Sequence, residues 1–384
     1  MKIDVVGLVL IIGAIQGLAL AFTIFQKSNK LYANKFLWIL MLTFSVMLLD
    51  LWLSDLGFYQ SHSKLMFTLE GIQLVIFPLY FLYSKYLTDK LTKFDKLDLI
   101  HFLPFFLYKL YLLPFYFMNF QEISWFQNYI TLSNYPLQYV IFNWVLILQG
   151  YFYLTFTVIK ANKRETFINE HFSSNVHIKL DWLKNASYLG ILTNLVFTIE
   201  NILLLTSSSV SDSFGISSIT AGIYIYAMGY LGFSKSVVFT EFDVIEKIEI
   251  EKENITNEKY LKSGLSKENA DKYFQKLIYL MEIEKIYKQN KLTLGDLADM
   301  ITISSHNLSE VINTKTGMNF FDFINKYRID EVKKEIIKHE NDNLTLLAIA
   351  LDSGFNSKSS FNTLFKKYEN VTPTQFKKLH QIKS

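Results

Sequence analysis

The chain has 384 residues, 51% of them hydrophobic and only 19% charged, with a formal net charge of +3. Soluble domains carry about 25% charged residues, so the charged fraction of this chain is low for a soluble protein. The absence of cysteine excludes disulfide frameworks, zinc–thiolate sites and thiol nucleophiles. Charge is also uneven, because 29 of the first 240 residues are charged against 44 of the last 144. We therefore expect a membrane domain over residues 1–240 and a water-soluble part after it.

Seven apolar segments are long enough to cross the roughly 30 Å of hydrocarbon in a bilayer. They lie at residues 5–25, 36–56, 65–87, 99–118, 135–159, 183–206 and 214–240. The first lacks a small-x-small cleavage site, so we expect a spanning helix rather than a signal peptide. Its Gly13 and Gly17 form a GxxxG pattern, which favours close helix packing inside one bundle over dimerisation. The fourth segment is interrupted by Pro104, Lys109 and Pro114.

The loops between these segments alternate in charge. The first, third and fifth loops each carry three or more basic residues, among them Lys30, Lys93 and Arg164, while the others carry one at most. Basic loops stay in the cytoplasm. With seven spans, this alternation predicts an N-terminus outside the cell and a cytoplasmic location for residues after 240.

Polar side chains at membrane depth are candidates for function. A charge at the bilayer centre costs about 2.5–3.5 kcal/mol on insertion scales, so such groups usually face the bundle interior. One interpretation is a ligand pocket, or a switch in which Lys109 pairs with Glu70 or Glu200. The other is interhelical hydrogen bonding or snorkelling to the interface. The candidate ligand-binding residues are Glu70, Gln73, Lys109, Asn143 and Glu200.

No catalytic pattern occurs in the chain. HExxH, GxSxG, GxGxxG and Walker-type glycine loops are all absent, and the spacing of His171 and His177 suits no helical metal face. We therefore expect a protein that is not an enzyme and that needs no metal or cofactor.

The part after residue 240 begins with an acidic juxtamembrane linker, 241–265, and continues with a soluble domain, 266–384. Within this domain, Leu292-Thr293-Leu294 recurs as Leu344-Thr345-Leu346, and with one inserted residue the match continues. Each copy, about 292–318 and 344–371, predicts a short helix, a tight turn and a second helix capped by a serine, Ser304 or Ser357. Each second helix ends before a residue that accepts a left-handed conformation, Gly317 or Asn370.

Two such helix–turn–helix (HTH) units suit DNA, since the second helix of each has the width of a major groove. We expect a small core in each unit, formed by Leu297, Ala298, Ile303, Leu308, Val311 and Ile312 in the first and by Ile349, Ala350, Phe355, Phe361, Leu364 and Phe365 in the second. A single helix over 320–339 is predicted to join them. Its length of about 30 Å is close to one turn of DNA.

The residues from Leu292 to Lys378 carry a family likeness. They include LTLGDLADMITISSHNLSEVINTKTGMNF, FINKYRIDEVKKEI and LTLLAIALDSGFNSKSSFNTLFKKYENVTPTQFKK. This stretch resembles the AraC/XylS-type DNA-binding domain. The whole chain looks like the membrane-anchored AraC-type regulators of Bacteroidetes, in which a multi-span segment replaces the soluble sensing domain. The resemblance implies a bacterial inner (cytoplasmic) membrane, promoter DNA as partner, and contact with RNA polymerase.

The resemblance maps the DNA-reading helices onto 304–314 and 357–368. The side chains expected at base edges are Ser305, His306, Ser309, Glu310 and Asn313 on the first helix, and Lys358, Ser359, Asn362 and Thr363 on the second. Lys366 and Lys367 are expected on phosphate. The alternative for each is a solvated helix surface, and for His306 a partly buried ring.

Two features depart from the family pattern. Thr302 stands where the second copy has Gly354, and a β-branched residue is strained there if the position needs a positive φ. The domain also lacks the basic excess of most DNA-binding domains, so its affinity from phosphate contacts is expected to be modest. We expect that useful occupancy needs either a homodimer or tandem sites on DNA. Arg328, the one arginine after residue 240, is expected to make a structural ion pair.

These observations predict an all-α protein, with a seven-helix transmembrane bundle followed by a cytoplasmic double-HTH domain. We interpret it as a one-component transcription regulator in the lipid bilayer, whose bundle senses a small-molecule or membrane signal. Two alternatives stay open. One is a membrane tether for DNA without signal input, and the other is an intramembrane enzyme fused to a DNA-binding domain.

Overall fold

The computed structural model describes residues 5–26, 32–89, 93–117, 131–132, 135–173, 180–206, 220, 224, 267–338 and 344–381. They form two compact units. The first comprises residues 1–163 and 179–240, and the second comprises 164–178 and 241–384. The second unit therefore includes a short stretch, 164–178, that precedes residue 240 in the chain.

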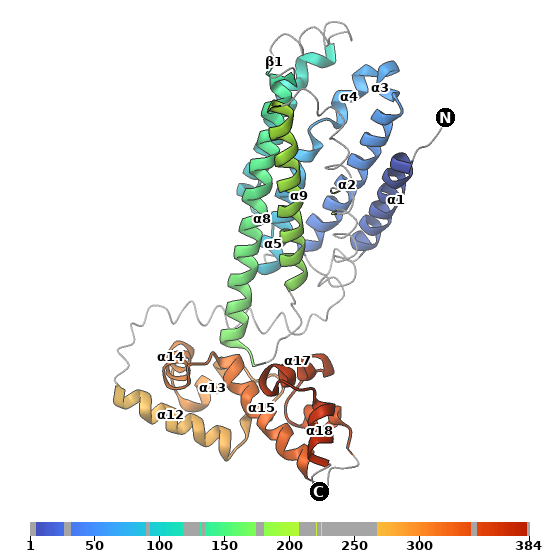
Figure 1. The fold of residues 1–384 in the computed structure, drawn as a ribbon. Helices are drawn as coiled ribbons and strands as arrows, with labels where there is room; N and C mark the ends of the chain where they lie inside the picture. Colours follow the sequence, from blue (N-terminus) through green and yellow to red (C-terminus); the bar gives the residue numbers. More distant parts are fainter. Residues whose placement is uncertain are drawn as a thin grey trace. The chain divides into compact units, whose positions relative to one another are not determined.

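The first unit is built of apolar helices (Figure 1). They are α1 (Val5–Gln26), α2 (Ala33–Asp55), α3 (Phe58–Ser61), α4 (Ser63–Leu69), α5 (Ile76–Thr88), α6 (Leu103–Leu112), α8 (Leu137–His171) and α9 (Asp181–Thr206), with 3-10 turns η2 (Ile72–Val75), η3 (Lys96–Phe102) and η4 (Leu113–Phe117). Strands β1 (Thr131–Leu132) and β2 (Tyr135–Pro136) pair antiparallel. This ribbon of two-residue strands leaves the fold class unchanged, so the predicted all-α character is confirmed.

Five segments of the described chain are long and apolar enough to cross a membrane, where seven were predicted. They are Ala33–Asp55, Phe67–Thr88, Lys96–Phe117, Leu137–His171 and Asp181–Leu203, and they correspond to the second to sixth predicted spans. The first predicted span is helical as α1, but its apolar stretch, Leu10–Gln26, is shorter. The seventh, 214–240, lies outside the described residues apart from 220 and 224.

Two of these segments are not continuous α-helices. Between α4 and α5 the helix breaks at Glu70 and Gly71, where Gly71 has φ +85° and a Cβ there would clash with the Tyr108 ring. The segment from η3 to η4 changes from 3-10 to α and back, with Pro104 in the first turn of α6 and Pro114 in η4. Proline lacks the N–H that an internal helical position needs, which explains the second interruption.

Helices α1 and α2 pack through small residues. A Cβ on Gly13 would meet Leu48 Cδ1 at 2.9 Å, and one on Gly17 would clash with Ser45 Oγ, both on α2. Helix α2 packs in turn on α5. The GxxxG pattern thus brings two helices of one chain together, which confirms the prediction of packing inside the bundle.

The second unit contains α12 (Lys267–Glu282), η6 (Ile286–Lys288), α13 (Leu294–Ile301), α14 (Ser305–Thr316), α15 (Phe320–Ile337), α16 (Leu346–Asp352), α17 (Lys358–Glu369) and α18 (Pro373–Gln381). Ser304 and Ser357 cap α14 and α17, each accepting a backbone N–H at 3.2 Å. Gly317 and Asn370 end these helices with φ of 70° and 58°. The predicted serine caps and left-handed ends are confirmed.

Helix α15 holds the two HTH units together. It contributes Phe320, Phe323 and Ile324 to a core with α12, α13 and α14. It contributes Phe321, Ile329, Val332 and Ile336 to a second core with α16, α17 and α18. The predicted core residues are buried, except that Ile303 is partly exposed. The helix ends at Ile337, two residues before the predicted end.

Arg328, on α15, is 1% exposed and makes no ion pair with a described residue, which corrects the prediction. Its guanidinium donates instead to the carbonyl oxygens of Tyr287 (2.7 Å) and Gln289 (2.8 Å) and to both oxygens of Ser173. Burial lowers the pKa of Arg328 to about 9. A Cβ on Gly354 would lie 2.5 Å from Tyr287 O and 2.8 Å from Arg328 Nε, so the turn of the second unit needs glycine.

Glu331 is a second polar anchor on α15, and its carboxylate is 2% exposed. It accepts hydrogen bonds from Lys288 Nζ (2.7 Å), Lys285 Nζ (3.0 Å) and Tyr287 Oη (3.0 Å). Burial alone raises the pKa of Glu331, but these hydrogen bonds outweigh it and hold the pKa at about 2.

Thr302 has φ 66° and Gly354 has φ 98°, so the strain predicted for Thr302 is present. We predict that Thr302→Gly raises the free energy of unfolding of the domain by about 1 kcal/mol, because it removes left-handed strain. Gly354→Ala is the matched opposite change and lowers it by more than about 2 kcal/mol, since it adds both strain and a clash. Pulse proteolysis of the full-length chain in urea measures both effects, and a destabilised Thr302→Gly variant would contradict the argument.

The folded-state pKa of Glu331 lies below its usual value of 4.5, so its stabilisation is present above about pH 4.5 and is lost as the pH falls towards 2. We predict that Glu331→Gln increases hydrogen exchange in 286–338 relative to the unchanged chain at pH 6. The difference between the two chains shrinks at pH 3, after correction for intrinsic rates. A difference that is constant with pH would exclude the carboxylate as its source.

Candidate nucleic-acid interface

Helices α14 and α17 present the predicted base-edge residues on their outer faces. On α14, His306, Glu310 and Asn313 are exposed, while Ser305 and Ser309 are partly exposed. The exposure of His306 overturns the alternative of a partly buried ring. On α17, all of the predicted residues are exposed, namely Lys358, Ser359, Asn362, Thr363, Lys366 and Lys367. The opposite faces of both helices lie in the cores, so the exposed residues keep one common direction on each helix.

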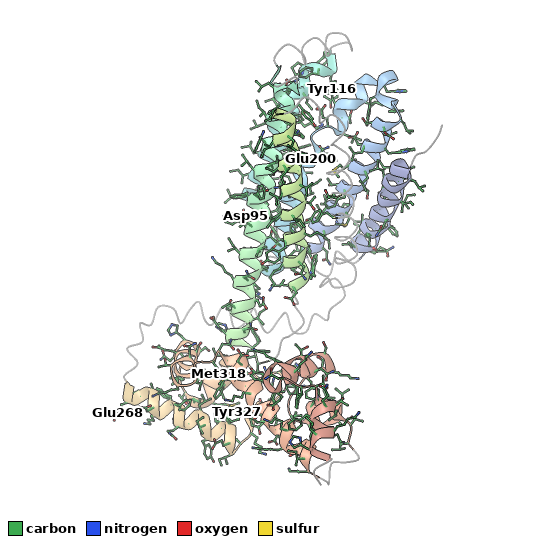
Figure 2. All side chains as sticks on the ribbon, viewed as in Figure 1. Asp95, Tyr116, Glu200, Glu268, Met318 and Tyr327 are labelled. Atoms are coloured by element: carbon green, nitrogen blue, oxygen red, sulfur yellow. The ribbon has the colours of Figure 1, made fainter. Side chains whose placement is uncertain are left out.

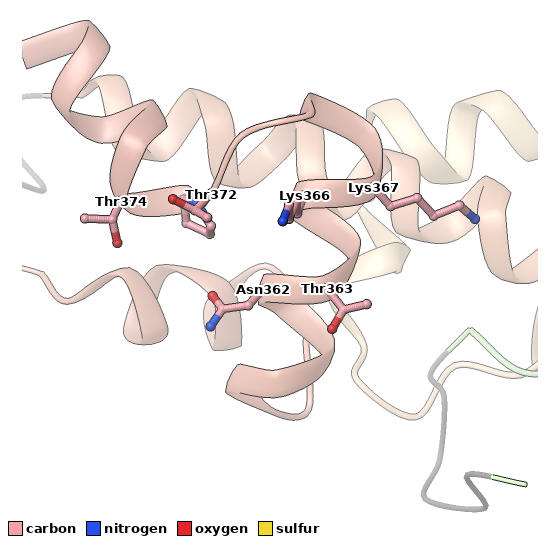
Figure 3. Close-up of a pocket in the computed structure, with 7 residues that line it drawn as sticks. Asn362, Thr363, Lys366, Lys367, Thr372 and Thr374 are labelled. Carbon is pink, nitrogen blue, oxygen red and sulfur yellow. The ribbon is translucent and has the colours of Figure 1, made fainter. Parts of the chain in front are cut away.

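A hollow lies between α17 and the start of α18. It is lined by Asn362, Thr363, Lys366, Lys367, Thr372, Pro373 and Thr374. Figure 3 shows Lys366 directed towards Thr372, while Lys367 extends away from it. Hydroxyl groups, an ammonium group and the start of a helix are together suited to a phosphate group.

Thr372 forms the start of α18. Its Oγ1 accepts from Gln375 N at 3.3 Å, and the Gln375 side chain accepts from Thr372 N at 2.9 Å. Residues 372–374 were not predicted as site residues. The signal available in the sequence was the threonine–proline pair, which marks a helix start and so a group of free N–H donors beside α17.

The two phosphate candidates, Lys366 and Lys367, differ in their surroundings. Lys367 Nζ donates to Asp322 Oδ1 at 2.8 Å, and Tyr368 Oη donates to the same oxygen at 2.7 Å. Burial raises the pKa of Asp322, but these hydrogen bonds outweigh it, so the pKa lies below its usual value. The carboxylate of Asp322 therefore offsets much of the charge of Lys367 and ties α17 to α15.

The candidate ligand-binding residues of the first, apolar unit fall into two groups. At the break between α4 and α5, Lys109 Nζ donates to the carbonyl oxygens of Phe67 (2.8 Å) and Thr68 (2.9 Å), and Tyr108 Oη donates to Glu70 Oε1 (2.7 Å). Glu70 Oε2 and Gln73 Oε1 are buried there without a hydrogen-bond partner among the described residues.

The second group lies where α8 packs on α9. Asn143 Nδ2 donates to Asn201 Oδ1 at 2.9 Å, next to the buried Glu200 on α9 (Figure 2). Interhelical hydrogen bonding, one of the two interpretations of these residues, is therefore confirmed for Lys109, Glu70 and Asn143. No ion pair joins Lys109 to Glu70 or Glu200 in the described part of the chain.

Comparison with known proteins supports the assignment of helix-turn-helix units to this part of the chain. Residues 297–379 match the family model of a helix-turn-helix domain. This part of the chain is an AraC-type HTH domain. The chain is 32% identical over 88 residues to the HTH-type transcriptional activator AarP of Providencia stuartii, which covers 23% of this chain and 63% of AarP.

An uncharacterized HTH-type transcriptional regulator of Staphylococcus aureus (strain COL) is 29% identical over 109 residues, 28% of this chain and 14% of that protein. An uncharacterized HTH-type transcriptional regulator of Haemophilus influenzae is 30% identical over 90 residues, 23% of this chain and 29% of that protein. The chain thus spans between about one seventh and two thirds of the length of these relatives. No solved structure gives a significant match.

We predict that Lys366→Gln weakens DNA binding equally for specific and nonspecific sequences and lowers the slope of log affinity against log salt by about 0.9, the loss of one phosphate contact. Lys367→Gln is the matched control, and we expect less than half of that change, because Asp322 already offsets its charge. Titrations of the full-length protein at several salt concentrations measure both slopes. Equal slopes for the two variants would contradict the assignment.

Proposed function

We propose that this protein is a membrane-integrated transcription regulator that binds promoter DNA site-specifically through its two HTH units. One observation carries the proposal: a single chain contains both five candidate spans and two HTH units. Both HTH units pack on the connecting helix α15 and keep an exposed polar face. We further propose that the DNA-binding domain lies in the cytoplasm of a bacterium, on the inner face of its membrane. It acts there as a homodimer and contacts RNA polymerase.

Dimerisation is proposed because the domain lacks a basic excess, with 12 basic against 12 acidic residues over 266–340. Three lysines around α14, α15 and α17 are already paired, namely Lys315 with Asp271, Lys333 with Glu369 and Lys367 with Asp322. A single copy is therefore expected to gain little from phosphate neutralisation. Two copies linked in one membrane multiply their affinities through effective concentration.

The signal is proposed to act at the break between α4 and α5. Broken helices in membranes leave backbone groups that other side chains satisfy, and such breaks often mark binding sites. Here Lys109 satisfies two freed carbonyl groups, and Gln149 Nε2 on α8 donates to Leu74 O at 3.0 Å. A ligand that competes for these polar groups would change the packing of α5, α6 and α8.

Immunoprecipitation of the intact cross-linked protein with genomic DNA tests the DNA-binding proposal. We predict a small number of sharp sites whose occupancy falls about tenfold or more with Asn362→Ala, because a bidentate contact of Asn to adenine contributes about 1–3 kcal/mol. The control is Lys326→Ala, an exposed change on α15. The proposal fails if no site is enriched in any growth condition, and occupancy that never varies would favour the tether.

We predict that Lys109→Met changes the transcription of the bound promoters at unchanged protein level, because it leaves the carbonyl groups at the helix break unpaired in hydrocarbon. Tyr151→Phe is the matched control, since it removes one α8–α9 hydrogen bond away from the break. Reporter expression and immunoblotting of membranes measure the two effects. Equal outputs for Lys109→Met and the unchanged chain would exclude the break as the sensing site.

A further inference from the structure

The two residues after helix α8 are docked on the DNA-binding domain. Phe172 and Ser173, which we name the docking segment, are 4% and 0% exposed. Phe172 forms an antiparallel bridge with Thr293, the N-cap of α13, and Ser173 N and Oγ donate to Leu292 O at 3.3 and 2.5 Å. The docking segment therefore holds the start of the first HTH unit.

The same serine also contacts the connecting helix α15. The Ser173 carbonyl oxygen accepts from Asn325 Nδ2 (2.8 Å) and Arg328 Nη1 (2.9 Å), and its Oγ accepts from Arg328 Nη2 (3.0 Å). Asn325 and Arg328 are each 1% exposed. Ser173 thus bridges the first HTH unit and α15 by hydrogen bonds that water does not reach.

Withdrawal of the docking segment has a cost. It would leave two Arg328 donors and one Asn325 donor unpaired in a buried place, and each such group costs about 1–3 kcal/mol, more for a charged one. These groups recover hydrogen bonds only if the start of α13 and the η6 region open to water. The position of the first HTH unit on α15 therefore depends on Ser173.

We propose that the docking segment is the connection through which helix α8 controls DNA binding: a seated Ser173 holds the first HTH unit in its reading position on α15, and withdrawal of Ser173 loosens that unit. Helix α8 runs without interruption from Leu137 to His171 and ends next to the docking segment. It also carries Gln149, which is bonded at the helix break, so a displacement of α8 reaches Ser173 directly along the helix. The effect on DNA rests on the function proposed above.

The absence of cysteine allows a direct test of docking. Residues paired in an antiparallel bridge have Cα atoms about 4.5–5.5 Å apart, which suits a disulfide. We expect Phe172→Cys with Thr293→Cys to close under mild oxidation of membranes that contain the full-length chain, as measured by protection from a maleimide that shifts gel mobility. The matched control pairs Phe172→Cys with Thr345→Cys, because Thr345 is the repeat counterpart of Thr293. This pair should not form a disulfide. Equal closure of the two pairs, or closure of neither, overturns the proposal.

The coupling to DNA is tested on the same full-length protein. We expect Ser173→Ala to lower operator affinity about fivefold or more, because it removes both hydrogen bonds of the Ser173 Oγ, the one to Leu292 O and the one from Arg328 Nη2. Adding the Phe172→Cys and Thr293→Cys pair in its oxidised form should restore the affinity, whereas the reduced pair should not. A purely structural role of Ser173 predicts no dependence of the rescue on oxidation, and this result overturns the coupling. If no form binds DNA, the proposed function fails, while disulfide closure still reports on docking.

Discussion

The arrangement of the DNA-binding domain depends on one buried guanidinium group. Arg328 uses its donors on Tyr287, Gln289, Asn325 and Ser173, all of them neutral acceptors. A buried charge without its hydrogen bonds is far more costly than a buried apolar side chain, so the segments that supply these acceptors must stay together. They are the η6 region, α15 and the residues after α8. The close approach of Gly354 adds the turn of the second HTH unit to the same centre.

The apolar helices follow the same physical rule in the lipid that we propose surrounds them. Lipid offers no hydrogen bonds, so each backbone group freed by a helix break needs a protein partner. Lys109 and Gln149 supply such partners at the break between α4 and α5. Polar side chains that would be costly in an uninterrupted span are tolerated here, because they form hydrogen bonds with the backbone groups freed by the break. Glu70 Oε2 and Gln73 Oε1 have no hydrogen-bond partner among the described residues, and the proposed signal site rests on this feature.

Much of the DNA-binding domain was predictable because its signals are local. The repeat at an offset of 52 to 53 residues, the serine caps and the left-handed residues at helix ends each act within a few positions. Helices α14 and α17 were therefore predicted to within two residues of their ends. The hollow beside α17 was missed, because it forms only when Thr372, just before α18, and Thr374, in its first turn, lie beside that helix. The pairing of Lys367 with Asp322 was also missed, because the two residues are 45 positions apart in the chain and meet only in the folded domain.

Composition, periodicity and the repeat thus determined the division of the chain, its helical character and the exposed helix faces that we propose for DNA contact. The tertiary structure decided which polar groups meet. Arg328 was expected to make an ion pair, and residues near 172 were expected to lie in a loop. The fold instead places Ser173 against Arg328, 155 residues away in the chain. Local patterns report the preferences of neighbouring residues. A buried hydrogen-bonding group, by contrast, takes whichever acceptor the packed chain brings within reach, and that partner is a property of the fold.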